Sequence, residues 1–420
     1  MPARSGGAHH ALRRCRHRGT IKGSVDEQLT LKEAAERVGV SPSTLRRWAE
    51  TGVIPEVDGS GGWTAAAVAH ARIVARLRDR GHRLEHIREA GRQGWLAYGY
   101  IAELLTGDEP PRSLTEAADA TQLEPALIER FWASIGLPPA ALERLDEDDV
   151  QALQYVASVL GAGFPLVAFL QLCRVYGSAL SQIADAEVRL FHLYVHEPLI
   201  REGVPGLQMA EEMESLASDL LPLASPLMDY VHQRFLQHYV EQDVVGHMEM
   251  EIEDEELTVG RLRIAIAFAD LAGFTRFTEE EGDEEALSSI ERFVERVSST
   301  LPEDARVVKT IGDEVMVVGQ DIGALVDWAV GFVPLFEERP EPRIGIHWGT
   351  ALYRDGDYYG REINLASRIV ARARGGEVLV SDAVVEAVRG SFHLTFEEIG
   401  QVKLKGFDKP RQLCRANLRE

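Results

Sequence analysis

Two aspartates in the C-terminal half, Asp270 and Asp313, stand where chemistry on phosphates is expected. Asp270 comes at the end of the near-continuous apolar run 262–271, which is typical of a strand buried on both faces, and a glycine turn and a helix follow it. A carboxylate in this place can hold a metal ion, while backbone N–H groups at the helix start, near Phe274 and Thr275, face phosphate oxygens. Taken alone, Asp270 would be better explained as a cap of that helix.

Asp313 lies at the tip of a predicted hairpin. Residues 307–318 form two apolar stretches around Gly312 and Asp313, which is a hairpin signal with a carboxylate at its turn. Carboxylates from two adjacent strand ends make a pair suited to two Mg²⁺ or Mn²⁺ ions, which can activate an attacking oxygen and clamp a triphosphate. The second aspartate therefore favours a metal site over simple helix capping.

More polar residues follow on the next predicted elements. A strand from Arg343 to Gly349 leads into a turn that holds Asp357. Asn364 and Arg368 are four residues apart, so they share one face of a predicted helix. Together with the two aspartates, these residues predict metal-dependent nucleotidyl chemistry.

Five segments of this half resemble, in their order and spacing, the catalytic domain of class III adenylate cyclases over residues 262 to about 418. The segments are FADLAGFT, KTIGDEVMVV, RIGIHWG, GDYYGREINLASR and VKLKGFDKP. The resemblance implies a ferredoxin-like α/β domain and a phosphorus–oxygen lyase that converts ATP into 3′,5′-cyclic AMP and pyrophosphate. It also implies that Asp270, the Leu271 carbonyl and Asp313 bind two Mg²⁺ or Mn²⁺ ions in each site.

The same resemblance implies the remaining substrate contacts. Arg343 would meet the triphosphate, Asn364 would orient the ribose, and Arg368 would stabilise the charge that builds on the α-phosphate in the transition state. Lys403 or Lys405 would serve the terminal phosphates, with Lys405 favoured.

Lys309 and Asp357 would select the base. Adenine offers an N1 acceptor and an N6 amino donor, which a Lys donor and an Asp acceptor complement, whereas guanine reverses the demand. Guanylate cyclases of this family use Glu and Cys at these places. The pair therefore predicts cyclic AMP as the product, and guanylate cyclase activity is the alternative that turnover of GTP would reveal.

In this family each active site is shared between two subunits of a head-to-tail dimer. This chain holds both sets of residues, namely the metal-binding Asp270 and Asp313 and the substrate-binding Lys309, Asp357, Asn364 and Arg368. The resemblance therefore implies a homodimer with two composite sites, which small subunit rotations could disassemble.

The N-terminal half carries a helix-turn-helix pattern. Gly39 ends a helical apolar face that starts at Leu31, Ser41 is a suitable N-cap, and Pro42 begins a second helix. Over residues 29 to about 92 this pattern resembles the winged DNA-binding head of MerR-type regulators.

Two arginines of the second helix, Arg46 and Arg47, could contact DNA phosphates or bases, or could form a solvated helix face. The wing departs from the pattern of the family, because Gly62-Trp63-Thr64 stands in place of the usual Tyr–Arg pair. These residues leave open a rival function, a DNA-binding transcriptional regulator whose cyclase-like domain senses nucleotide.

The helix-turn-helix pattern recurs 83 residues later, in residues 114–138, which indicates an internal duplication. The second copy presents Phe131 and Trp132 and leads into an uncharged run, 150–173. Three glutamines and a central Gly–Pro segment in that run favour two buried helices joined by a turn over a membrane span. This copy is suited to burial against a partner subunit or a small apolar ligand.

A helical connector is expected over residues 176–256, and it ends in an acidic run. His192 and His196 would share a helix face, where they could titrate near neutrality, hold a metal ion or have no function. Residues 110–256 resemble the helical regulatory region of actinobacterial pH-responsive adenylate cyclases. The resemblance implies an autoinhibitory module.

The composition limits the remaining possibilities. The 420 residues include 45 Lys and Arg against 67 Asp and Glu, and the net charge of −22 makes the whole chain a poor polyanion binder. Residues 1–95 carry 17 basic and 10 acidic residues, so the excess of negative charge lies in the remainder. Three widely spaced cysteines give no disulfide framework or zinc spacing, and the N-terminus lacks the apolar region of a secretory signal. Both features predict a cytoplasmic protein.

We therefore expect an α+β chain with an all-α N-terminal half and a ferredoxin-like C-terminal domain. The expected parts are a flexible basic arm, a MerR-like helix-turn-helix, a helical regulatory domain with its connector, and the catalytic domain, in residues 1–28, 29–95, 110–256 and 257–420.

Overall fold

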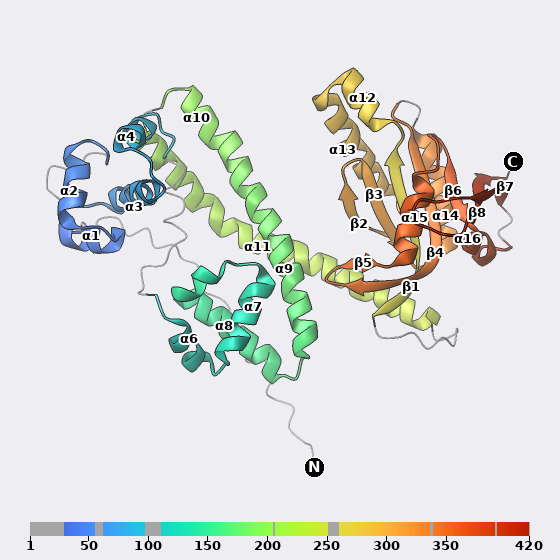
Figure 1. The fold of residues 1–420 in the computed structure, drawn as a ribbon, viewed down its shortest axis with the longest axis horizontal. Coiled ribbons are helices and arrows are strands. Elements are labelled where there is room, and N and C mark those ends of the chain that lie inside the picture. The colour runs from blue at the N-terminus through green and yellow to red at the C-terminus, as the bar shows by residue number, and fades with distance from the viewer. Residues whose placement is uncertain are drawn as a thin grey trace, which may run out of the picture. The chain divides into compact units, whose positions relative to one another are not determined.

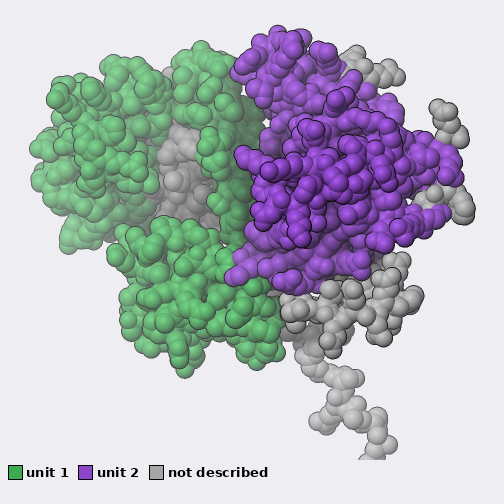
Figure 2. Space-filling model, turned by 45° about the vertical axis from the view of Figure 1, so that its right-hand side comes forward, with its two compact units in different colours: residues 1–236 green, residues 237–420 purple. Residues whose placement is uncertain are grey.

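The computed structural model describes residues 29–54, 62–96, 111–204, 206–250, 260–336, 339–390 and 393–419. The chain divides into two compact units, Met1–Leu236 and Gln237–Glu420, which Figure 2 distinguishes by colour. The predicted basic arm, the tip of the predicted wing and the acidic run from residue 251 onward lie outside the described residues. The four domain boundaries expected from the sequence remain predictions.

The first helix-turn-helix forms as its local signals predict (Figure 1). Helix α1 (Leu31–Val38) starts at a capping box between Thr30 and Glu33 and ends at Gly39, which has a φ of 77°. Helix α2 (Pro42–Glu50) starts at Ser41, whose side chain accepts a hydrogen bond from the N–H of Thr44.

Two longer helices, α3 (Ala65–Asp79) and α4 (Leu84–Arg92), complete this core. Trp63 is 3% exposed within it, and its backbone pairs with Leu29 in an isolated antiparallel bridge. The tryptophan that replaces the expected wing pair is therefore a core residue.

The second helix-turn-helix repeats this arrangement. Helices α6 (Leu114–Thr121), α7 (Pro125–Ile135), α8 (Glu147–Gly161) and α9 (Leu166–Phe191) begin 83, 83, 82 and 82 residues after α1, α2, α3 and α4. The local signals recur as well, because Ser113 and Glu116 form a capping box and Arg112 pairs with Leu145 as Leu29 pairs with Trp63. A short 3-10 helix, η1 (Pro139–Glu143), follows α7.

Helices α8 and α9 form and are joined by a turn, as predicted, but they are buried only in part. Helix α8 buries Val150, Leu153 and Val156, while Tyr155 is 62% exposed on the same helix. On α9, Val167 is 68% exposed. The expectation that both helices are buried thus holds only for one stripe of each helix, because their apolar residues surround the helix and the others stay exposed.

One helical stretch among the described residues, Leu166–Arg201, is long and apolar enough to cross a membrane by length and composition, with a mean hydropathy of 1.2. A single stretch of this kind is weak support for a membrane span.

The connector is helical, as expected. A π-helical turn, η2 (His192–His196), leads into α10 (Glu197–Arg201), and the long α11 (Gly206–Met250) follows. The boundary between the two compact units falls within α11.

The second unit is built on one mixed sheet. Its strands are β1 (Arg261–Leu271), β2 (Arg306–Ile311), β3 (Glu314–Gly319), β4 (Pro342–Arg354), β5 (Asp357–Tyr359), β6 (Val378–Ser381), β7 (Leu394–Val402) and β8 (Arg411–Leu418). They lie in the order β2-β3-β1-β4-β6-β8-β7, and β5 pairs with β4. The antiparallel set β2-β3-β1-β4 is the expected ferredoxin-like core (Figure 1).

Helices cover both faces of this core because β1 is apolar on both sides. Its alanines at positions 265, 267 and 269 face a cluster that includes residues of α13 (Asp283–Thr300), α14 (Ile322–Phe332) and α16 (Asp382–Ala387). Its larger residues Ile264, Ile266 and Phe268 pack against α15 (Arg361–Val370). The short η3 (Val333–Leu335) continues α14.

Two local expectations for this unit are corrected. The single helix expected to follow Asp270 is two helices, α12 (Phe274–Glu281) and α13, because Gly282 has a φ of 90° and interrupts them. Asp357 begins strand β5 instead of lying in the turn before it, because its backbone pairs with Arg354 of β4.

Candidate active site

The first part of the site is a contact between the ends of two paired strands. Asp270 and Arg343 are partners in the β1–β4 register. The Arg343 Nε donates to Asp270 Oδ2 at 2.7 Å, its Nη2 contacts the same oxygen, and its Nη1 donates to the Ala373 carbonyl at 3.2 Å. Asp270 is 7% exposed, so a guanidinium neutralises an otherwise buried carboxylate.

Two more carboxyl groups lie beside this pair. Asp313 occupies the β2–β3 turn, which Gly312 makes with a φ of 65°, and Glu314 is the register partner of Asp270 in β3. Burial, together with the charge of Asp270, raises the pKa of Asp313 to about 6.

Glu314 was not singled out by the sequence. Its pKa is raised to about 7, first by burial and then by the charges of Asp270 and Asp313, against the opposing charges of Arg343 and Arg368. Its position directly after Asp313 in the hairpin could have drawn attention to it. The face of the sheet on which its side chain lies, however, depends on the register of β3 against β1.

These residues fit a divalent cation. Burial and the nearby negative charges raise the pKa values of Asp313 and Glu314, so these two groups hold protons that a cation could replace. Asp270, Asp313 and the Leu271 carbonyl carry oxygen ligands of the kind that Mg²⁺ and Mn²⁺ prefer, and they would hold such a cation. Among the described residues, no group of three or more His, Cys, Asp and Glu side chains could hold a metal ion by itself.

The second part of the site is the ion pair between Lys309 of β2 and Asp357 of β5. The other oxygen of Asp357, Oδ1, accepts a hydrogen bond from the N–H of Tyr358 at 2.8 Å. The two residues predicted to select the base are therefore in contact within one chain, although 48 residues separate them.

A β-bulge sets the direction of Lys309. Arg306 pairs with Val318 and Lys309 pairs with Met316, and the register shifts between Val307 and Lys309. Val318 and Met316 belong to the cluster on the α15 side of the sheet. In a regular strand Arg306 and Lys309 would point to opposite faces, so the extra residue brings both to the same face.

The third part of the site is α15. Ile363, Ala366 and Val370 bury one side of this helix, and Asn364 and Arg368 are exposed on it. The predicted common face of Asn364 and Arg368 is consistent with this burial pattern. The helix lies close to β4, because a Cβ added at Gly345 would come within 2.6 Å of the Val370 Cα.

A buried hydrogen-bond network, which the sequence did not indicate, ties α15 to the sheet. His347 of β4 is bonded through Nδ1 to Ser381 Oγ at 2.7 Å and through Nε2 to Glu362 Oε2 at 2.6 Å. Burial lowers the pKa of His347. Ser381 is 1% exposed, so this Ser–His–Glu arrangement positions α15 and has no access to a substrate.

The remaining predicted contacts lie on exposed segments. Thr275 is exposed and Phe274 is half-buried at the start of α12. Lys403 and Lys405 are exposed between β7 and β8, on either side of the buried Leu404. The structure records no contact that brings these four residues to the aspartates.

In the first unit, Arg46 and Arg47 are exposed on α2. Other arginines of the same module make internal contacts, since Arg72 donates to the Arg37 carbonyl at 3.1 Å and Arg88 to the Thr51 carbonyl at 3.4 Å.

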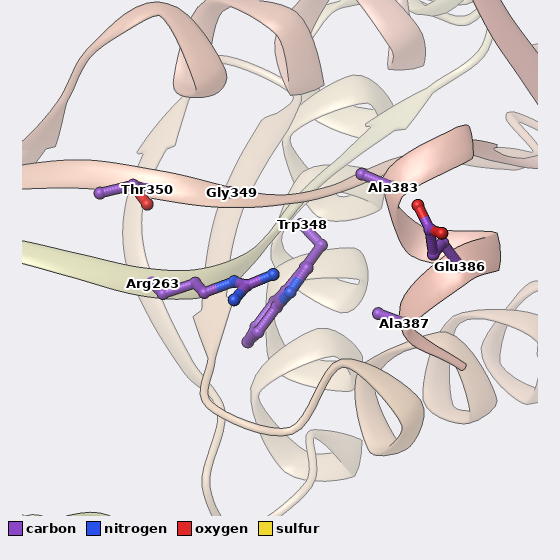
Figure 3. Close-up of a pocket in the computed structure, with 7 residues that line it drawn as sticks. All are labelled: Arg263, Trp348, Gly349, Thr350, Ala383, Glu386 and Ala387. Atoms are coloured by element: carbon purple, nitrogen blue, oxygen red, sulfur yellow. The ribbon is translucent and has the colours of Figure 1, made fainter. Parts of the chain in front are cut away.

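A pocket of about 360 Å³ lies elsewhere in the second unit (Figure 3). The Arg263 guanidinium lies over the Trp348 ring there, 5.5 Å from its centroid, and Glu386 of α16 borders the pocket. None of the predicted site residues lines it, so it is separate from the candidate active site.

The sheet order, the paired aspartates and the Lys309–Asp357 contact define a class III nucleotide cyclase. Residues 261–414 match the adenylate and guanylate cyclase catalytic domain, and residues 29–93 match the MerR helix-turn-helix family. The chain belongs to the adenylate cyclase family.

Several relatives are similar beyond the catalytic domain. An adenylate cyclase of Streptomyces coelicolor is 33% identical over 67% of this chain and 73% of its own length. An uncharacterized protein of Mycobacterium tuberculosis is 30% identical over 82% of this chain and 91% of its own, and a pH-sensitive adenylate cyclase of that species is 29% identical over 81% and 85%. The solved adenylyl cyclase CyaB from P. aeruginosa is 24% identical, covers 39% of this chain and 98% of that one, and has a TM-score of 0.36.

Proposed function

We propose that this adenylate cyclase converts ATP into 3′,5′-cyclic AMP and pyrophosphate at two composite sites of a cytoplasmic homodimer. The observation that carries the choice of ATP is the contact between Lys309 and Asp357, which presents one donor and one acceptor together. This combination complements the Watson–Crick edge of adenine and opposes that of guanine.

The reaction forms a bond between the ribose 3′-oxygen and the α-phosphorus and breaks the bond to pyrophosphate. Mg²⁺ or Mn²⁺, held by Asp270, Asp313 and the Leu271 carbonyl, would lower the pKa of the 3′-hydroxyl and neutralise triphosphate charge. Arg343 and Lys405 would hold the phosphates, with backbone N–H groups at Phe274 and Thr275. Asn364 would orient the ribose, and Arg368 would meet the charge that grows on the α-phosphate.

The homodimer is supported by two features of the described residues. Asn364 and Arg368 are exposed on α15, where a second copy can supply the metal-bound triphosphate. The turn η2 and helix α11 also expose large apolar side chains, namely Tyr194 on η2 and Leu223, Leu227 and Tyr230 on α11, at 63–76%. Surfaces of this kind are typical of subunit contacts, and we assign them to the second copy.

Complementation tests the composite site. Asp270→Ala and Arg368→Ala should each lose activity, and mixed heterodimers should recover part of it, because one of their two sites is complete. A mixture of Asp270→Ala with Asp313→Ala is the matched control and should stay inactive, since both changes affect the same half of a site. Heterodimers that form without recovery would refute the shared site.

We further propose that the N-terminal half regulates this activity by autoinhibition. The full chain should then be less active than residues 237–420, the second compact unit. Equal activity of both across pH would argue against a regulatory role for the N-terminal half.

A second candidate function, DNA binding, rests on the exposed Arg46 and Arg47 of the MerR-like module. It predicts binding to promoter DNA that weakens with salt and is lost in Arg46→Ala/Arg47→Ala. A footprint together with normal cyclase activity would indicate a protein with both functions, and a footprint without cyclase activity would favour the regulator.

A further inference from the structure

Arg306 lies between the end of helix α11 and the pair that selects the base. It stands at the start of β2, three positions before Lys309, and the bulge places both on the α15 side of the sheet. No step of the proposed reaction uses it.

Two tyrosine rings make cation–π contacts with the Arg306 guanidinium. Its central carbon lies 5.2 Å from the ring centroid of Tyr239, on α11, and 5.8 Å from that of Tyr358, on β5. Its Nη2 also donates to the Tyr358 hydroxyl at 2.6 Å. Two cation–π contacts and a hydrogen bond fix a guanidinium more narrowly than any one of them alone.

Tyr358 connects the Arg306 guanidinium to the base-selecting pair, Lys309 and Asp357. Its ring is 5% exposed and packs on Tyr353 with centroids 5.1 Å apart. Its backbone N–H donates to Asp357 Oδ1 at 2.8 Å, and the other oxygen of Asp357 binds Lys309. A continuous set of contacts therefore runs from Tyr239 through Arg306 and Tyr358 to Asp357.

The C-terminal part of α11 makes a second contact near β2. The side-chain amide of Gln242 donates to the backbone carbonyl of Glu303, in the segment that leads into this strand. Tyr239 and Gln242 are three residues apart, so they lie on one side of the helix. Both contacts hold the same part of α11 against the edge strand that carries Lys309.

We propose that Arg306 is a positioning residue for adenine recognition, which holds Asp357 through Tyr358 when Tyr239 of α11 is seated on its guanidinium. Helix α11 thereby sets how well the site discriminates between ATP and GTP, and Tyr239 is the contact through which it acts. This inference rests on the proposed role of Lys309 and Asp357 in base selection.

The test compares Tyr239→Leu, Tyr239→Phe, Tyr358→Phe and Arg306→Lys in the full chain, by initial rates with ATP and with GTP. Tyr239→Phe is the matched control, because it keeps the aromatic face. The other three should raise KM for ATP and reduce the ratio of kcat/KM for ATP over GTP, by about threefold to tenfold, with kcat for ATP nearly unchanged. Tyr239→Phe should behave as the unchanged protein.

Three outcomes overturn the inference. One is an unchanged ATP to GTP ratio in Tyr239→Leu and Arg306→Lys, and another is a loss of kcat alone, which a merely structural role would produce. The third is a Tyr239→Phe protein as impaired as Tyr239→Leu. Lys309→Ala is measured in parallel. It distinguishes a failure of the proposed coupling through Arg306 from a failure of the proposed function. If Lys309→Ala leaves the ratio unchanged, the base-selecting assignment itself is wrong, whereas a changed ratio with unaffected Arg306 and Tyr239 variants refutes only the coupling.

Discussion

Arg343 donates from two of its nitrogens to a single oxygen of Asp270, across the paired strands β1 and β4. The residue proposed to hold the triphosphate therefore occupies, in this structure, the carboxylate proposed to hold the metal. With these proposed roles, binding of a metal–nucleotide complex would require the guanidinium to pass from Asp270 to a phosphate, so we expect the two residues to exchange partners.

Removal of Arg343 should separate metal affinity from nucleotide affinity. In Arg343→Ala, Asp270 loses its competing cation, so Mn²⁺ alone should bind several-fold more tightly. KM for ATP should rise at the same time because a phosphate contact is lost. Titration calorimetry with Mn²⁺ in the absence of nucleotide measures the first effect, and unchanged or weaker Mn²⁺ binding would contradict the exchange of partners.

Metal affinity should depend on pH. The pKa values of Asp313, about 6, and Glu314, about 7, lie above those of ordinary carboxyl groups. A cation binds their charged forms, so Mn²⁺ binding should release protons below pH 7 and its apparent affinity should rise with pH between 5 and 7. Calorimetry in two buffers with different ionisation enthalpies counts the protons. Glu314→Gln should reduce that count, and proton release identical to that of the unchanged protein would show that Glu314 takes no part.

Exchange of the base-selecting pair should change the preferred nucleotide. Lys309→Glu with Asp357→Cys presents the acceptor and donor that guanine requires, and should shift the ratio of kcat/KM toward GTP by roughly 10- to 100-fold. The single substitution Lys309→Glu should lower activity with both nucleotides, since two acidic groups would then face each other. Retention of the ATP preference by the double variant would remove the basis for choosing ATP.

A methyl group at Gly345 should displace α15. Its Cβ would come within 2.6 Å of the Val370 Cα, which belongs to the backbone of the helix and has little room to move. Gly345→Ala should cost about 1–3 kcal/mol of unfolding free energy. It should also lower kcat strongly, because α15 carries Arg368. Gly331→Ala in α14 is the matched control, since no atom lies within 4 Å of its added Cβ, and it should leave both quantities nearly unchanged.

Acid should destabilise the first helix-turn-helix through His70. This side chain is 4% exposed, its Nε2 lies 3.0 Å from the Val53 carbonyl, and burial lowers its pKa to about 4. The unfolded chain binds a proton below about pH 6.5 and the folded module does not until about pH 4. Up to about 3 kcal/mol of stability is therefore lost as the pH falls through this interval.

Hydrogen exchange of α2 and α3 between pH 7 and 4, corrected for intrinsic rates, measures this loss. His86→Gln, at an exposed histidine of the same module, should leave the pH dependence unchanged. A His70 substitution that folds and keeps the full pH dependence would assign the acid sensitivity to another group.

Much of this architecture could be read from the sequence because its signals are local. A cap such as Ser41, a glycine such as Gly39 and a proline at the first helical position act within one turn, so they fix helix ends without knowledge of the rest of the fold. The duplication was visible because residues such as Pro42 and Pro125 recur at a constant spacing, although Glu124 stands where Ser41 caps the first copy. Gly282 was a signal of this kind that the sequence interpretation missed.

The sequence predicted those residues of the candidate site whose type and spacing match the five cyclase segments. The five cyclase segments pointed to Asp270, Asp313, Lys309 and Asp357. They did not indicate Glu314, His347 or Arg306, because their positions depend on which residues face each other across strands. A shift of one residue in strand register moves a side chain to the other face of the sheet.

The sequence by itself therefore determined the family, the helical N-terminal half followed by a cyclase domain, and the residue types of the proposed site. Only the tertiary structure decided which side chains meet. The bulge before Lys309 turns it to the face of Arg306 and Tyr358, the β1–β4 register sets Arg343 on Asp270, and packing around Gly345 holds α15 against the sheet. These relationships join residues far apart in the chain, so they arise from pairing and close packing, which no short segment specifies.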